Sequence, residues 1–111
     1  MNAKRQGKWR RIGLLLPSAN LVMEADFYRN LPENITVHTT RMYLPETTVE
    51  GEEKMLDEFV LPAARTIENV KPVVVVFGCT SAGALRGKQY EEGLLQTSSK
   101  TVHAPVGSVM S

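Results

Sequence analysis

The stretch PVVVVFGCTSAG, residues 72–83, decides how this chain of 111 residues folds. Its four consecutive valines and Phe77 are stiff β-branched or aromatic residues, and no polar residue alternates with them. A continuous apolar run of this length is typical of a strand that is buried on both faces inside a parallel sheet. The sequence therefore predicts a central strand over residues 73–77, with a neighbouring strand on either side.

A small and polar turn follows this strand. Gly78 breaks the strand and leaves Cys79, the only cysteine of the sequence, at its carboxyl end, with Thr80 and Ser81 directly behind. In an open α/β sheet, ligands bind in the crevice outside the carboxyl ends of the strands. Cys79 therefore stands where chemistry is expected.

The rest of the chain alternates between strand and helix patterns. Apolar or alternating runs predict further strands over residues 11–16, 35–42 and about 101–106. Capped or amphipathic segments predict helices over about residues 21–30, over a stretch after Thr47 that reaches Ile67, and over about 88–98, with a glycine-bearing loop before Gly87. Thr47 and Glu50 have the spacing of a capping box, and Pro62 should kink or restart the helix that contains it.

This alternation of strands and helices predicts an α/β fold with right-handed crossovers and a parallel sheet. In the flavodoxin-like arrangement the strand order is 2-1-3-4, with helices flanking the sheet and the switch point between the first and third strands. That order brings residues 17–20 beside residues 78–81. We assign residues 1–10 to a basic tail and residues 11–111 to one α/β domain.

Composition and charge limit the possible partners. The sequence has 13 basic and 12 acidic residues, and this net charge of +1 gives no electrostatic case for nucleic acid or an anionic membrane. The longest apolar runs, residues 12–16 and 73–77, are too short to span a bilayer. A single cysteine fits a reducing compartment. We expect a cytoplasmic protein without a membrane or nucleic-acid partner.

Cys79 and Asn20 each admit two interpretations. A thiol between a strand and a helix can be activated by the helix dipole as a nucleophile or base, but free cysteines are also common as small buried hydrophobes. Backbone N–H groups and hydroxyls of Thr80 and Ser81 could bind a carboxylate or an oxyanion. Ser18 or Asn20 could cap the first helix, and the Asn20 amide could instead donate to a substrate carboxylate.

Other sites are weakly indicated. Six residues separate Cys79 from Arg86, one more than in the phosphate loop of cysteine phosphatases. His38, His103 and Cys79 lack the spacing of metal ligands, so no metal site is expected. The sequence contains neither a Gly-x-Gly-x-x-Gly pattern nor a P-loop, so no cofactor is expected.

Three motifs, IGLLLPSAN at residues 12–20, TVEG at 48–51 and VFGCTSAG at 76–83, together resemble the aspartate/glutamate racemase superfamily. The resemblance is to the branch of maleate cis-trans isomerase, arylmalonate decarboxylase and the racemase-like protein of ectoine utilisation. It implies a cofactor-independent site between two pseudo-symmetric α/β halves, each bringing one cysteine to a small carboxylate.

Carried over by position, the resemblance makes Cys79 the catalytic cysteine of the first half. Thr80 and Ser81 would hold a substrate carboxylate, together with Ser18 and Asn20 from the neighbouring loop. Arylmalonate decarboxylases lack this first-half cysteine, so Cys79 favours isomerase or racemase chemistry over decarboxylation. The other alternative is a non-catalytic module that binds small carboxylates.

The chain departs from the family pattern because it holds a first half only, with no second cysteine. We therefore expect it to be part of a longer protein or to form a homo-oligomer in which another chain supplies the opposite wall. By itself the chain should have little or no activity.

Overall fold

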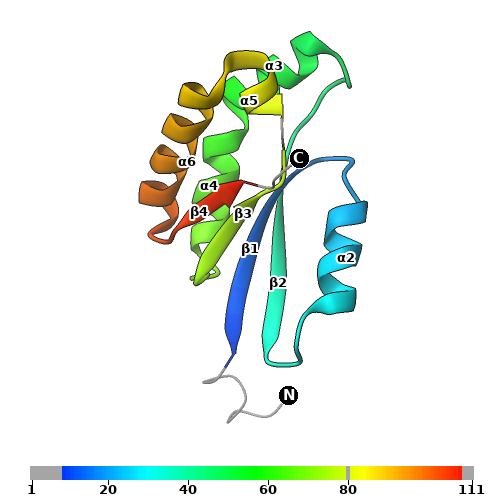
Figure 1. Ribbon diagram of the computed structural model, residues 1–111, viewed down its shortest axis with the longest axis vertical. Coiled ribbons are helices and arrows are strands. Elements are labelled where there is room, and N and C mark those ends of the chain that lie inside the picture. Colours follow the sequence, from blue (N-terminus) through cyan, green and yellow to red (C-terminus); the bar gives the residue numbers. More distant parts are fainter. Residues whose placement is uncertain (1–8, 80, 109–111) are drawn as a thin grey trace.

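A four-stranded parallel sheet in the order β2-β1-β3-β4 forms the centre of the molecule (Figure 1). The computed structural model describes residues 9–79 and 81–108. The strands are β1 (Arg10–Pro17), β2 (Ile35–Met42), β3 (Val74–Phe77) and β4 (Val106–Ser108). The predicted strand order and the central place of the valine strand are confirmed.

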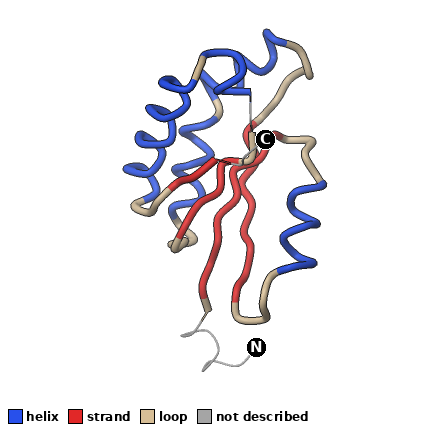
Figure 2. Tube along the Cα trace, in the orientation of Figure 1, coloured by secondary structure: helices blue, strands red, loops and turns tan. Residues whose placement is uncertain are grey.

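Helices cover the two faces of the sheet unequally (Figure 2). One face carries α4 (Val60–Glu68) and α6 (Lys88–Val102), and the other face carries α2 (Val22–Asn30). The remaining helices, α3 (Val49–Glu58) and α5 (Ser81–Arg86), lie towards the carboxyl ends of the strands. None of the helices in this described part of the chain is long and apolar enough to cross a membrane.

The continuous apolar run of β1 is explained by burial on both faces. Leu15 faces the α4 side and shares a buried cluster with Phe77 and Ile67, whereas Leu14 and Leu16 share the opposite cluster with partly buried residues of α2. A strand with helices on both faces has no solvent side on which polar residues could alternate.

The single helix predicted after Thr47 is divided into α3 and α4. Its predicted cap and its predicted break both lie at other residues than expected. The cap is Thr48, whose hydroxyl accepts a hydrogen bond from the Gly51 N–H at 3.0 Å, so the prediction of Thr47 was wrong by one residue. The helix restarts after Phe59 and not at Pro62. Pro62 therefore lies in the first turn of α4, where a missing N–H group leaves no bond unmade.

Two predictions near the C-terminal end were wrong. Residues 81–86, expected to belong to a loop, form helix α5. The strand expected at 101–106 is displaced, because α6 continues to Val102 and β4 begins at Val106. His103 has a left-handed backbone conformation, with φ of 59°, and its N–H donates to the Ser99 carbonyl, which ends the helix.

Candidate active site

The turns that follow β1 and β3 leave the same edge of the sheet from neighbouring strands, because β1 and β3 are paired in parallel. Leu15 is paired with Phe77 across the two central strands, and the Gly78 N–H donates to the Leu15 carbonyl at 2.8 Å. A Cβ on Gly78 would lie 2.2 Å from Leu16 Cδ2 and 2.8 Å from the sulfur of Met23, in the first turn of α2. The start of α2 is therefore packed directly against the turn that leads into Cys79.

Cys79 is nearly fully buried, with only 8% of its surface exposed. Its Sγ is 2.8 Å from Ser81 Oγ, and Ser81 is equally buried. Cys79 also belongs to the buried cluster that contains Leu15 and Phe77. The thiol is thus both a core residue and the partner of a hydroxyl group. Thr80 lies outside the described residues.

Asn20 and Ser18 occupy the turn between β1 and α2. The Asn20 N–H donates to the Pro17 carbonyl at 3.0 Å, and Asn20 Oδ1 accepts from the Met23 N–H at 3.4 Å. Asn20 Oδ1 therefore binds a backbone N–H in the first turn of α2, whose N-cap residue is Leu21, and Asn20 Nδ2 has no hydrogen-bond partner among the described residues. Ser18 does not cap this helix, because its Oγ accepts from the Leu44 N–H at 3.1 Å.

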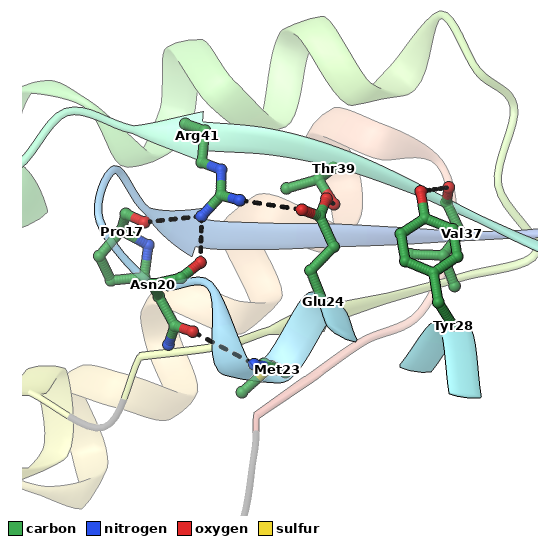
Figure 3. Close-up of polar contacts among 8 residues, drawn as sticks. All are labelled: Pro17, Asn20, Met23, Glu24, Tyr28, Val37, Thr39 and Arg41. Carbon is green, nitrogen blue, oxygen red and sulfur yellow. Dashed lines mark hydrogen bonds and ion pairs between the residues drawn. The ribbon is translucent and has the colours of Figure 1, made fainter. Parts of the chain in front are cut away.

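Arg41, which sequence reasoning treated only as part of an alternating strand, holds this turn from β2 (Figure 3). Its Nη1 donates to the carbonyl oxygens of Pro17, at 3.2 Å, and of Asn20. Its Nη2 is 3.1 Å from the carboxylate of Glu24, which also accepts from the Thr39 hydroxyl. An arginine in this alternating strand, whose residues are mostly partly buried, was the only sequence signal of this role.

Arg86, the residue weighed for a phosphate loop, is bound to acidic side chains of α3. Its guanidinium donates to Glu53 at 2.9 Å and to both oxygens of Asp57, at 2.7 and 3.1 Å. It also donates to the Tyr90 hydroxyl and lies 4.8 Å from the centre of that ring. These bonds lower the pKa of Asp57 and raise that of Arg86. Arg86 therefore ties α5 to α3 and α6.

Both histidines lie outside these turns. His38 Nε2 is 2.8 Å from the Thr36 hydroxyl, and burial together with the charge of Arg11 lowers the pKa of His38. His103 is exposed at the end of α6. Within residues 9–79 and 81–108, no group of three or more His, Cys, Asp or Glu side chains is placed to hold a metal ion.

No protein-family model matches this sequence, and no curated protein matches it either. Solved structures do match its fold. A cysteine-to-alanine variant of the maleate isomerase from Pseudomonas putida S16, solved with maleate, has a TM-score of 0.78 and 22% sequence identity, over 91% of this chain and 45% of that chain.

Two further solved structures match the fold to a similar degree. The maleate cis-trans isomerase of Nocardia farcinica, bound to Tris, has a TM-score of 0.76 and 24% identity, over 89% of this chain and 44% of that chain. A double mutant of arylmalonate decarboxylase in a liganded form has a TM-score of 0.72 and 24% identity, over 89% and 41%. The chain thus spans less than half the length of these proteins, and it shares their fold over 91%, 89% and 89% of its own length.

Proposed function

We propose that this chain forms the first half of a cofactor-independent site for a small carboxylic or dicarboxylic acid, in which Cys79 is the catalytic thiol. The observation that carries the proposal is that the Cys79 turn and the Asn20 turn leave neighbouring central strands at the switch point of the sheet, with Gly78 packed against Leu16 and Met23. The fold shared with maleate isomerases, one of them solved with maleate, supports a small carboxylate as the ligand.

Neutral donors would bind the carboxylate in this proposal. Asn20 Nδ2 has no hydrogen-bond partner within residues 9–79 and 81–108, and the hydroxyl of Ser18 can donate while its oxygen accepts from Leu44. Ser81 and Thr80 would complete the set from the other turn. The guanidinium groups of Arg41 and Arg86 already face acidic partners, so they are assigned no contact with substrate.

The chemistry requires the thiolate form of Cys79. In a racemase the thiolate removes the α-proton and a second thiol returns a proton to the other face. In a cis-trans isomerase the thiolate adds to the double bond, the resulting single bond rotates, and the carbon–sulfur bond then breaks. Ser81 could donate a hydrogen bond to the thiolate, since the two side chains are already in contact.

We further propose that the opposite wall comes from a second half, either in a longer chain or in another subunit. The full-length activity is then either that of a maleate-type isomerase or that of the racemase-like branch associated with ectoine utilisation. The single cysteine supports a cytoplasmic location for this protein.

A non-catalytic module that binds small carboxylates is the second candidate. It is favoured by the burial of Cys79, whose exposed fraction of 8% leaves little of the thiol for a substrate. Replacing Cys79 with alanine separates the two candidates in a full-length protein. Binding of the carboxylate should survive in both cases, but loss of proton exchange at the α-carbon, or of double-bond isomerisation, is expected only for the enzyme.

Alkylation of Cys79 by iodoacetamide tests the proposed site directly in this chain. Maleate should slow the alkylation in a concentration-dependent way, because a bound carboxylate would cover the thiol. Asn20→Ala should abolish this protection, which is measured in each variant relative to its own rate without maleate. Thr47→Ala, at an exposed position without a hydrogen bond in the described residues, is the control. An alkylation rate that maleate does not change would refute the proposal.

A further inference from the structure

We infer that Arg41 is a positioning residue, which holds the turn of residues 17–20 in the conformation that presents Asn20 and Ser18 to a carboxylate. This inference rests on the proposed function, since it assigns a residue on β2 to the same site. Arg41 would act through the turn and would not touch the substrate.

The position of Arg41 follows from the strand register. Leu16 is paired with Arg41 and Pro17 with Met42, so Arg41 lies on β2 beside the last residues of β1. From there its Nη1 reaches the carbonyl oxygens at both ends of the turn, those of Pro17 and Asn20. The Asn20 N–H also bonds to the Pro17 carbonyl. A single guanidinium group thus fixes the start and the end of this turn.

The ion pair between Arg41 and Glu24 also connects Arg41 to α2. Glu24 lies in the first turn of the helix. Its carboxylate accepts hydrogen bonds from Arg41 Nη2 and from the hydroxyl of Thr39, which both lie on β2 (Figure 3). The side chains of Arg41 and Glu24 are 30% and 28% exposed, so the pair is largely shielded by protein. A planar guanidinium can donate hydrogen bonds to the two carbonyls and the carboxylate at the same time. A lysine ammonium lacks this planar arrangement of donors.

Few other contacts hold α2 in place. None of its described residues is buried, and its far end adds a bond of 3.4 Å from the Tyr28 hydroxyl to the Val37 carbonyl. The apolar contacts of Met23 and Phe27 are with the cluster of Leu14, Leu16 and Val37, which lies outside residues 17–20. The direction of the Asn20 amide is therefore set by its bond to the Met23 N–H and by the hold of Arg41 on the turn. Pre-ordering a binding loop in this way strengthens binding, because less freedom is lost when the ligand binds.

The test compares Arg41→Ala and Arg41→Lys with Arg29→Ala. Arg29 is an exposed residue of α2 that makes no hydrogen bond or ion pair in the described part of the chain. Three quantities are measured for each variant of the whole 111-residue chain: the amide hydrogen-exchange rates of Asn20 and Met23, the dissociation constant for maleate by NMR titration, and the urea midpoint of unfolding.

Arg41→Ala should raise the exchange rates of the Asn20 and Met23 amides about tenfold or more, and should weaken maleate binding by a similar factor. Arg41→Lys keeps the positive charge and most of the packing, so it should restore the unfolding midpoint but neither the exchange rates nor the affinity. Arg29→Ala should change none of the three quantities. If Arg41→Ala does not fold, Arg41→Lys alone decides the question.

The inference is overturned if the two amides exchange at the wild-type rate in both Arg41 variants, or if they exchange faster while maleate binds as tightly as before. A wild-type chain that binds no maleate would instead contradict the proposed function. In that case the exchange rates still decide whether Arg41 orders the turn.

Discussion

Gly78 shows at the scale of one residue how tightly the candidate site is built. A Cβ at this position would lie 2.2 Å from Leu16 Cδ2 and 2.8 Å from Met23 Sδ, both from elements that meet at the site. Gly78→Ala should therefore destabilise the fold by about 1–3 kcal/mol, as overpacked cores do. Urea unfolding monitored by circular dichroism measures the change.

The matched control for Gly78→Ala is Gly93→Ala. Gly93 lies inside α6, and a Cβ there would meet no atom within 4 Å. Alanine is favoured over glycine in a helix interior by about 0.5–1 kcal/mol, so Gly93→Ala should stabilise the protein. Equal effects of the two substitutions on the free energy of unfolding would show that the close contacts at Gly78 do not matter for stability.

Arg86 sets the titration of Asp57, which gives a prediction about pH. The hydrogen bond from Arg86 lowers the pKa of Asp57 in the folded protein from its usual 3.8. Asp57 therefore stabilises the fold above its unfolded pKa, and this stabilisation is lost as the pH falls through the folded pKa. Arg86→Gln should raise the pKa of Asp57 towards 3.8 and remove this part of the acid dependence.

Carboxyl-carbon NMR titration of both proteins measures this change. Glu68 is the internal control, because its pKa is lowered mainly by a hydrogen bond from Lys71 and not by Arg86. Its titration should be the same in both proteins. If Asp57 titrates at the same pH with and without Arg86, the pairing seen in the structure does not persist in solution.

At the scale of the element, the start of α3 distinguishes two neighbouring threonines. Thr48 caps the helix by accepting the Gly51 N–H, whereas Thr47 is exposed and makes no hydrogen bond in the part of the chain described. Thr48→Ala should cost about 1 kcal/mol of stability, the usual effect of losing such a cap. Thr47→Ala should change the stability by less than about 0.5 kcal/mol. Chemical denaturation of the two variants measures both values, and a larger loss for Thr47→Ala would favour the capping box predicted from the sequence.

At the scale of the whole molecule, one thiol limits what the chain can catalyse. In the proposed function the opposite wall of the site, and in a racemase the second thiol as well, comes from a second half, and this sequence holds Cys79 alone. The isolated chain should therefore convert no measurable maleate to fumarate, as followed by proton NMR. Turnover that persists at concentrations where sedimentation shows only monomer, and that Cys79→Ala removes, would contradict this prediction.

The elements that were predicted well are those whose own residues carry the signal. The apolar runs of β1 and β3, and the alternation in β2, lie within one strand each, and the order 2-1-3-4 is that of the flavodoxin-like arrangement, which the alternation of strands and helices indicated. The elements that were missed depend on distant contacts. Helix α5 is short and rich in small residues, and Arg86 ties it to α3 and α6.

For the candidate site, the sequence by itself determined the residue types and their edge of the sheet. Ser18 and Asn20 follow one strand with a buried apolar run, and Cys79 and Ser81 follow another. The two strands are paired in parallel, so both turns lie at the same edge of the sheet. Only the tertiary structure decided that Ser81 faces the Cys79 thiol, that Asn20 Oδ1 accepts from the Met23 N–H, and that Arg41 holds the turn of residues 17–20. The physical reason is that a hydrogen bond across strands depends on register and on side-chain direction, and neither of these is carried by the residues of one segment alone.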